Sequence, residues 1–222
     1  MLLAGSNFLL MHLIHRGLVN KKFKENILAS FKQSFKKGFG IETDIHATKD
    51  KQFVCFHDFT LKKTFKISKS IKNLNYQRIK EISKSKKAEI PLLSDLLKLS
   101  KKRFFLFIEI KPLFTKDLLK KLITETKAYS KCVFISFKHK NIYDILKIKK
   151  QAKVGLSFGN NLSAKTIINQ SKNKNIKYIV LDRCFLENKK IKNLKKEKYF
   201  YTIKTKKDFL KHQNNNLIFE NL

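Results

Sequence analysis

The 222-residue sequence predicts one compact α/β domain, a barrel of the TIM (β/α)8 type. From residue 8 onward, short runs rich in β-branched and aromatic residues alternate with longer amphipathic segments, which is typical of repeated βα units around a parallel sheet. Several short runs, such as 104–108 and 178–181, are apolar throughout, as expected for strands that are covered on both faces. No linker composition divides the chain, so residues 1–222 are expected to form a single domain.

Eight strands and seven helices are expected in alternating order. The expected strands are 8–14, 39–45, 104–110, 132–136, 153–157, 176–181, 198–203 and 216–219. The expected helices are 26–37, 94–101, 115–129, 139–150, 163–173, 186–196 and 205–213, with Ser94, Thr115, Ser163 and Thr205 as N-cap residues.

Two departures from a regular barrel are expected. Residues 49–93 carry an additional apolar run at 53–56 and are too long for a simple loop, so they form an excursion after the second strand. The sequence stops just after the eighth strand, so the closing helix of most eight-unit barrels is expected to be absent.

A formal net charge of +33 is the most unusual feature of the composition. Clustered basic charge would indicate nucleic acid or an anionic membrane as a partner. The lysines are instead spread along the chain, and A/T-rich codons account for them together with the abundant Asn, Ile and Phe residues. We therefore expect no specific nucleic-acid partner, at most a weak contact with an anionic membrane, and a field that attracts an anionic substrate. The oligomeric state stays open.

The cysteines bear on the compartment. Cys55, Cys132 and Cys184 are odd in number, widely spaced and embedded in apolar runs, which favours buried, reduced thiols over a disulfide framework. Residues 2–14 are apolar but lack the flanking pattern of a signal peptide, and no apolar stretch reaches the about 18 residues of a membrane span. A cytoplasmic location is the resulting expectation.

Four short stretches that close apolar runs carry the chemistry. They are His15-Arg16-Gly17, Glu42-Thr43-Asp44, His57-Asp58 and Glu109-Ile110-Lys111. Because the carboxyl ends of parallel barrel strands meet at one face, we expect these side chains to converge. Their charges and proton-transfer groups would then share one site.

Glu42 and Asp44 lie two residues apart on a strand, so their side chains leave the same face. Two carboxylates at such a short separation repel each other unless a cation or a proton lies between them. Oxygen ligands select Mg²⁺ or Ca²⁺, and Glu109 at the end of the next barrel strand supplies a third oxygen. Pairing with lysines is the alternative, but it is weaker for carboxylates framed by apolar residues. Arg16 is suited to bidentate contact with a phosphate.

In combination, these stretches resemble the glycerophosphodiester phosphodiesterase family, which is built on a TIM barrel. Other segments that match the family pattern are Glu25-Asn26, Thr48-Lys49-Asp50, Leu61 with Thr64, 90–97 and Ser136-Phe137. The resemblance implies hydrolysis of glycerophosphodiesters to sn-glycerol 3-phosphate and an alcohol with a divalent metal, Mg²⁺ or Ca²⁺. The implied roles are acid–base catalysis for His15 and His57, metal binding for Glu42, Asp44 and Glu109, and phosphate binding for Arg16 and Lys111. Attack through a cyclic phosphate and direct attack by water both stay open.

Four further residues are candidates to line the pocket, namely Asp58, Ser136, Phe137 and Tyr201. The chain also departs from the family pattern, with Lys63 for an arginine, Tyr201-Thr202 for Trp-Thr, and Glu220-Asn221 for Thr-Asp. These departures concern substrate fit and barrel closure. Two other functions stay open: a phosphodiesterase for lysophospholipids or other phosphodiesters at a membrane, and a non-catalytic barrel that binds anionic polymers or membranes.

Overall fold

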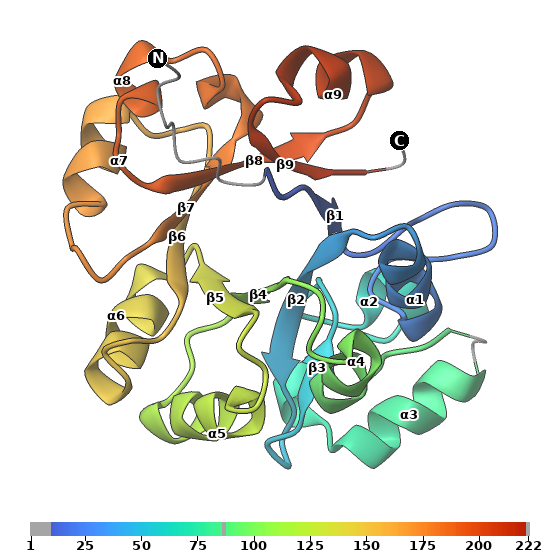
Figure 1. Ribbon diagram of the computed structural model, residues 1–222. Coiled ribbons are helices and arrows are strands. Elements are labelled where there is room, and N and C mark those ends of the chain that lie inside the picture. Colours follow the sequence, from blue (N-terminus) through green and yellow to red (C-terminus); the bar gives the residue numbers. More distant parts are fainter. Residues whose placement is uncertain (1–9, 86–87, 221–222) are drawn as a thin grey trace.

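The computed structural model describes residues 10–85 and 88–220, which form a closed barrel of parallel strands (Figure 1). The barrel strands, in their order around the barrel, are β1 (Leu13–His15), β2 (Gly40–Ala47), β4 (Leu106–Ile110), β5 (Cys132–Ser136), β6 (Val154–Phe158), β7 (Tyr178–Asp182), β8 (Glu197–Ile203) and β9 (Asn216–Phe219). Strand β1 pairs with both β2 and β9, which closes the barrel and confirms the predicted fold class.

Helices surround the barrel strands. They are α1 (Leu28–Lys36), α4 (Leu93–Ser100), α5 (Lys116–Thr126), α6 (His139–Ile148), α7 (Ala164–Gln170), α8 (Lys189–Lys192) and α9 (Lys206–His212). Three predicted N-caps are confirmed, because Thr115, Ser163 and Thr205 each accept a hydrogen bond from a backbone N–H of the first turn. The Ser94 prediction is wrong: α4 begins at Leu93, and its N-cap residue is Leu92.

An aromatic and aliphatic plug fills the barrel below its carboxyl end. It consists of Leu13, Phe107, Val133, Ile135, Tyr178, Val180, Tyr199 and Ile218. The rings of Phe107 and Tyr199 lie 4.4 Å apart between their centroids. Because side chains two residues apart on a strand share a face, Leu13 and Phe107 place His15 and Glu109 directly above this plug. The plug therefore gives the polar residues a rigid floor.

The predicted excursion after β2 is a small folded unit. It contains β3 (Phe53–Cys55), α2 (Lys62–Phe65), the 3₁₀ turn η1 (Ile71–Asn73) and α3 (Tyr76–Ser85). Strand β3 pairs antiparallel with β2, and the unit lies beside the barrel rather than within it (Figure 1). Its apolar side chains form a cluster separate from the main core, comprising Val54, Phe56, Leu61, Phe65, Ile71, Leu74, Ile79, Ile82 and Ile90.

Several predicted boundaries are wrong for local reasons. The first helix begins at Leu28 rather than residue 26, because Asn26 has a left-handed backbone (φ 55°). The expected helix 186–196 shrinks to α8, which the Asn188 side chain caps. Helix α3 was not predicted. The expected strand 8–14 begins within residues 1–9, which lie outside the described residues, and its described part starts at Leu13.

Two further observations concern the compartment. Cys55 and Cys132 are buried as predicted, but Cys184 is exposed, because it lies in the turn after β7 where the Asp182 side chain accepts its backbone N–H. Within residues 10–85 and 88–220, no helix has the length and apolar character required to cross a membrane.

Candidate active site at the carboxyl end of the barrel

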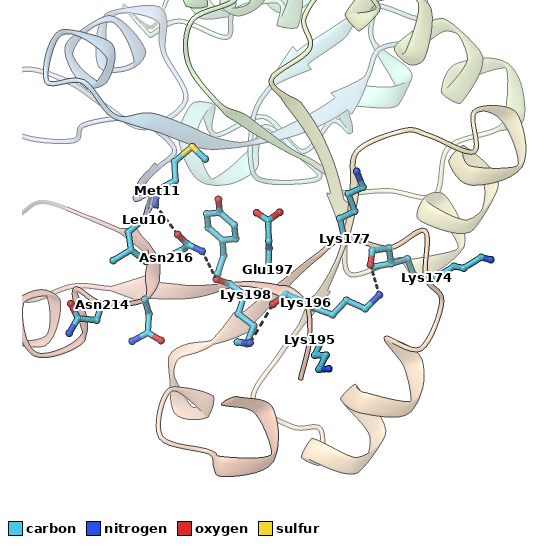
Figure 2. Close-up of a pocket in the computed structure, with 13 residues that line it drawn as sticks. Leu10, Met11, Lys174, Lys177, Lys195, Lys196, Glu197, Lys198, Asn214 and Asn216 are labelled. Atoms are coloured by element: carbon cyan, nitrogen blue, oxygen red, sulfur yellow. Dashed lines mark hydrogen bonds between the residues drawn. The ribbon is translucent and has the colours of Figure 1, made fainter. Parts of the chain in front are cut away.

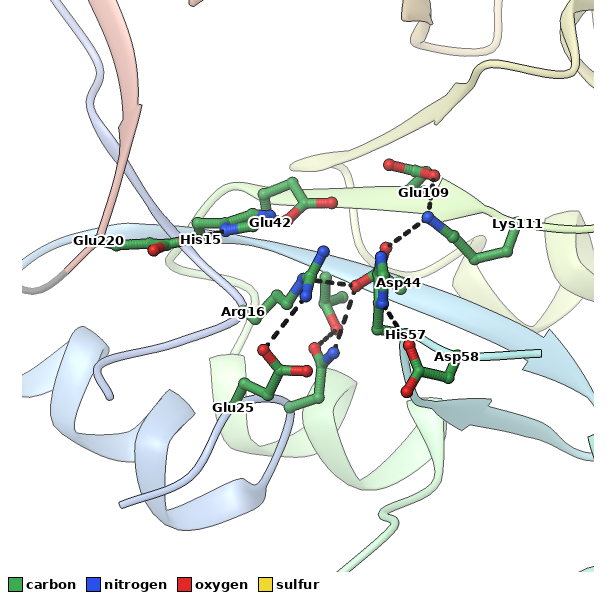
Figure 3. Close-up of polar contacts among 12 residues, drawn as sticks. His15, Arg16, Glu25, Glu42, Asp44, His57, Asp58, Glu109, Lys111 and Glu220 are labelled. Carbon is green, nitrogen blue, oxygen red and sulfur yellow. Dashed lines mark hydrogen bonds and ion pairs between the residues drawn. The ribbon is translucent and has the colours of Figure 1, made fainter. Parts of the chain in front are cut away.

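Strand register brings the four polar stretches together. His15, the last residue of β1, lies beside Glu42 of β2, and Asp44 of β2 lies beside Glu109 of β4. In parallel strands, residues in register point to the same face, so these side chains enter the barrel mouth together. His57 arrives from the excursion, where the backbone N–H of Phe56 donates to the Asp44 carbonyl (3.0 Å). The predicted convergence is therefore present (Figure 3).

Glu42, Asp44 and Glu109 form a buried carboxylate cluster. Their side chains belong to residues only 3%, 1% and 8% exposed, and one oxygen from each lies within 4.8 Å of the others. Burial, followed by repulsion from Asp44, raises the pKa of Glu42 well above its usual value. The same causes raise the pKa of Glu109 to about 7. Both groups therefore resist ionisation even with Arg16 and Lys111 nearby.

The cluster fits a divalent cation. The Oε2 atom of Glu42 is buried without a hydrogen-bond partner among the described residues. Ionising a buried carboxyl group that lacks a partner is costly, and a hard cation with several oxygen ligands offsets that cost. These three residues are therefore the ones that could hold such a cation.

Two cationic side chains balance part of this charge. The Nε atom of Arg16 lies 3.0 Å from Asp44 Oδ2, and the Nζ atom of Lys111 lies 3.4 Å from Asp44 Oδ1. Lys111 also pairs with Glu109 at 2.9 Å. Burial alone would raise the pKa of Asp44, but Arg16 and Lys111 outweigh it and lower that pKa. Asp44 therefore stays ionised.

Asn26 supports this arrangement, a role that its place in the sequence does not reveal. Its side-chain amide donates to Asp44 Oδ2 (3.3 Å), and its side-chain oxygen accepts from Thr43 Oγ1 (2.8 Å). Its backbone N–H donates to the Arg16 carbonyl (2.8 Å). The available signal in the sequence was the pair Glu25-Asn26, which begins ten residues after His15. No spacing rule links Asn26 to Asp44.

Each histidine of the site contacts its own carboxylate through Nδ1. His15 Nδ1 lies 2.6 Å from Glu220 Oε1, and His57 Nδ1 lies 2.8 Å from Asp58 Oδ1. Such contacts orient an imidazole ring and leave Nε2 available for other contacts. Glu220 lies just after β9 and appeared in the sequence only as a departure from a family pattern. The structure places it against His15.

The buried side chain of His46 contacts the backbone of the loop that carries His57. His46 continues the face of Glu42 and Asp44 along β2, and its Nε2 atom lies 3.2 Å from the His57 carbonyl oxygen. Burial lowers the pKa of His46, which favours its neutral form. Its ring also meets the Phe59 ring edge-on, with 5.1 Å between centroids.

A cavity of about 230 Å³ opens above the cluster. Its polar lining includes His15, Arg16, Glu42, His57, Glu109, Lys111, Ser157 and Thr202, and its apolar and aromatic lining includes Ile135, Phe137, Val180, Tyr201 and Ile218. The Tyr201 hydroxyl donates to the Phe158 carbonyl (3.0 Å), so its ring is fixed at the cavity wall.

Two candidate pocket residues lie elsewhere. Ser136 is fully buried, and its hydroxyl donates to the Ile110 carbonyl (2.7 Å) while accepting from the Lys138 backbone N–H (3.0 Å). It braces the β5 end instead of lining the cavity, because its side chain points away from the barrel interior. Asp58 contacts His57 but lines a different cavity, next to Lys63.

A larger cavity, of about 590 Å³, lies at the opposite end of the barrel (Figure 2). Residues that precede or begin β1, β7, β8 and β9 line it, among them Lys174, Lys177, Lys195, Lys196 and Lys198. The ammonium groups of Lys196 and Lys198 donate to backbone carbonyls there. Neither histidine of the site nor a carboxylate of the cluster reaches this end. The smaller cavity is therefore the candidate active site.

Comparison with known proteins agrees with this geometry. Residues 15–216 match the model of the Glycerophosphoryl diester phosphodiesterase family. The chain belongs to that family. A glycerophosphodiester phosphodiesterase from Caldanaerobacter subterraneus subsp. tengcongensis is 31% identical over 158 residues, which cover 65% of each chain. The human lysophospholipase D GDPD1 is 39% identical over 70 residues, covering 31% of this chain and 22% of that protein.

This member of the glycerophosphoryl diester phosphodiesterase family shares its fold with a solved structure. A phosphodiesterase from Oleispira antarctica, solved with the product sn-glycerol-3-phosphate, superposes with a TM-score of 0.81 at 19% identity. The similarity covers 95% of this chain and 92% of that one. The barrel is thus common to both proteins.

Proposed function

We propose that this chain hydrolyses glycerophosphodiesters to sn-glycerol 3-phosphate and an alcohol. The observation that carries the proposal is one cavity lined by two histidines, each held by a carboxylate, and by two members of a buried carboxylate cluster. Phosphodiester hydrolysis requires a proton acceptor for the nucleophile, a proton donor for the leaving oxygen, and positive charge for the phosphoryl oxygens. This cavity brings together residues for all three tasks.

His15 and His57 are the proposed acid–base pair. Because Glu220 and Asp58 contact their Nδ1 atoms, the Nε2 atoms are the positions that exchange protons with substrate. One ring takes the proton from the attacking hydroxyl, and the other gives a proton to the departing alkoxide. The attacking hydroxyl belongs either to water or to the glycerol of the substrate, and both routes use the same two rings.

Glu42, Asp44 and Glu109 are the proposed ligands of a divalent cation, Mg²⁺ or Ca²⁺. Their mutual distances within 4.8 Å support this assignment, as does the buried Glu42 Oε2 atom, which accepts no hydrogen bond from the described residues. When bound, such an ion supplies Lewis acidity toward a phosphoryl oxygen. Arg16 and Lys111 line the same cavity and add fixed positive charge for the phosphate.

Release of sn-glycerol 3-phosphate from sn-glycero-3-phosphocholine, with Mg²⁺ or Ca²⁺ supplied, tests the proposal. We expect turnover by the wild type and its loss in His15→Ala and His57→Ala. His212→Ala is the matched control, because His212 lies on α9 and contacts Glu187 away from the cavity. No release by the wild type under either metal would refute the proposed activity.

A lysophospholipid is the second candidate substrate. The apolar and aromatic lining of one cavity wall, with Phe137 and Tyr201, favours a substrate with an apolar portion. The resemblance to the human lysophospholipase D also supports this choice. Turnover of lysophosphatidylcholine and glycerophosphocholine, measured side by side, separates the two substrates.

We also propose a cytoplasmic protein that acts as one domain. The single domain is supported by the family match to residues 15–216, which includes six of the eight barrel strands whole, the last residue of β1 and the first residue of β9. The cytoplasmic location is supported by free cysteines. Cell fractionation tests the location, and a single cooperative unfolding transition tests the domain.

A further inference from the structure

Exposed apolar side chains gather at the mouth of the candidate active site. Among the described residues, the large apolar side chains that are exposed are Leu10, Phe59, Leu113, Phe137 and Leu210. Three of them follow the ends of β3, β4 and β5 on loops that also carry site residues. We call Phe59, Leu113 and Phe137, which are 52%, 58% and 42% exposed, the apolar rim.

Barrel topology places the apolar rim on one side of the mouth. Strand β4 lies between β2 and β5, and β3 pairs with β2. Phe59 comes two residues after His57, Leu113 two residues after Lys111, and Phe137 itself lines the cavity. The apolar rim therefore borders the entrance that a substrate uses.

The exposure of Leu113 is built into the structure. The buried side chain of Asn141 accepts a hydrogen bond from the Phe114 backbone N–H (3.0 Å) and donates one to the Pro112 carbonyl (2.8 Å). Both neighbours of Leu113 are thus fixed, and its side chain points outward from a braced loop. Exposure of a leucine side chain to water costs free energy, and a partner that covers the side chain removes that cost.

Basic residues accompany each member of the apolar rim. Lys62, Lys116 and Lys138 follow Phe59, Leu113 and Phe137 within three positions, and all three lysines are exposed. None of them enters an ion pair within the part of the chain that the structure describes. Apolar side chains interspersed with lysines match a bilayer with anionic headgroups, where the former enter the acyl region and the latter meet phosphates.

Nucleic acid matches this surface less well. Phosphates would attract the lysines, but an aliphatic side chain such as Leu113 offers no plane on which a base can stack.

We propose that the apolar rim and its lysines dock the barrel mouth on an anionic lipid bilayer. The further statement that a lipid phosphodiester then enters the cavity from the bilayer rests on the proposed function.

A tryptophan reporter tests the docking directly, because the chain contains no tryptophan. In Leu113→Trp, we expect the emission to shift to shorter wavelength with vesicles of phosphatidylcholine and phosphatidylglycerol. The shift should be much smaller with phosphatidylcholine alone. Leu210→Trp is the matched control, because Leu210 is 50% exposed but lies on α9 at the side of the barrel, and it should not shift. Equal shifts at both positions, or a shift with duplex DNA but not with vesicles, would overturn the proposal.

Vesicle sedimentation gives a second test. Leu113→Ser should weaken binding to the anionic vesicles about tenfold, as expected when one leucine side chain no longer leaves water. Leu210→Ser should bind as the wild type does, and thermal unfolding confirms that both variants are folded. Unchanged binding of folded Leu113→Ser would refute insertion of the apolar rim. If the wild type turns over soluble glycerophosphocholine but does not bind vesicles, docking alone is refuted. If it binds vesicles but turns over no phosphodiester, the proposed function alone is refuted.

Discussion

The Nδ1 atom of His15 lies 2.6 Å from the Oε1 atom of Glu220, although 205 positions separate the two residues. The contact joins the ends of β1 and β9, which are the two strands whose pairing closes the barrel. The hydrogen bond with His15 lowers the pKa of Glu220, so this carboxyl stays ionised. Closure of the fold and orientation of a proposed catalytic ring thus depend on the same pair of strand ends.

Glu220→Gln should lower kcat on glycerophosphocholine about tenfold, with little change in KM. The amide keeps the shape of the side chain but loses the charge that orients the His15 ring, and correct orientation is part of the roughly 10²–10⁴-fold effect of acid–base groups. Steady-state kinetics measure both constants. Glu187→Gln is the control, because Glu187 pairs with Lys192 away from the cavity and should behave as the wild type. An unchanged kcat in Glu220→Gln would show that the contact is only structural.

His57→Asn should lower kcat by about 10²–10⁴-fold while metal affinity stays within about twofold of the wild-type value. The reason is that His57 lines the cavity but is not a member of the carboxylate cluster. Calorimetric titration with Mg²⁺ or Ca²⁺ measures the affinity. A parallel loss of metal affinity would contradict a role in proton transfer alone.

Glu109→Gln should make the metal-free protein more stable than the wild type near neutral pH, by about 1–2 kcal/mol. Burial raises the pKa of Glu109 from 4.5 to about 7, so the folded state binds this proton more tightly than the unfolded state does. That group's contribution to stability is present below about pH 4.5 and is lost as pH rises through about 7. Urea unfolding in EDTA should therefore show a difference between the two proteins that shrinks toward pH 5.

The same pair of proteins should reverse their order when metal is added. A bound cation stabilises the folded state by an amount that grows with the logarithm of its affinity, and removal of one oxygen ligand weakens that affinity. The wild type should gain more thermal stability from Mg²⁺ or Ca²⁺ than Glu109→Gln does. Equal shifts in the two proteins would place the metal elsewhere.

One thiol of the three should react with an aromatic disulfide reagent in the native protein. Cys184 is exposed, whereas Cys55 and Cys132 are buried. Burial raises the pKa of Cys55 and of Cys132 to about 12, which leaves almost no thiolate at neutral pH. The reaction should be absent in Cys184→Ser, and all three thiols should react in denaturant. A native count above one would show that a buried thiol is accessible.

Acidification should destabilise the protein partly through His12. Burial lowers its pKa below 6.5, and its Nδ1 atom has no hydrogen-bond partner among the described residues. The unfolded chain then takes up this proton first, so stability falls as pH decreases through about 6.5. Because the ring packs against Phe209 (4.9 Å between centroids), His12→Phe keeps the contact and removes the titration. Its urea midpoint should fall less than that of the wild type between about pH 7.5 and 5.5.

The barrel could be predicted because its signals are local. Continuous apolar runs mark strands such as β4 and β7, and these runs alternate with amphipathic segments. Convergence of His15, Glu42 and Glu109 followed from the general rule that parallel strand ends share a face. Helix α3 was missed because charged and polar residues flank its two buried isoleucines, Ile79 and Ile82, so its apolar face is short.

The contacts that complete the site could not be predicted in the same way. The left-handed backbone of Asn26 ends a loop at the point where its side chain reaches Asp44. The position of that loop depends on tertiary packing. Glu220 contacts His15 only after the barrel closes. Ser136 has the residue type expected of a pocket, but the orientation at the end of β5 turns it toward the Ile110 carbonyl. Neither composition nor spacing encodes these orientations.

The side chains of the site come from two parts of one domain, each of which packs around its own apolar cluster. His15 and the carboxylates belong to the barrel, whereas His57 is carried by a unit with its own cluster around Phe65 and Ile79. Local opening of that unit would misalign one proton-transfer group while the metal ligands keep their places. Heat inactivation should thus precede loss of barrel circular dichroism, and amide exchange should be faster in the excursion than in β4.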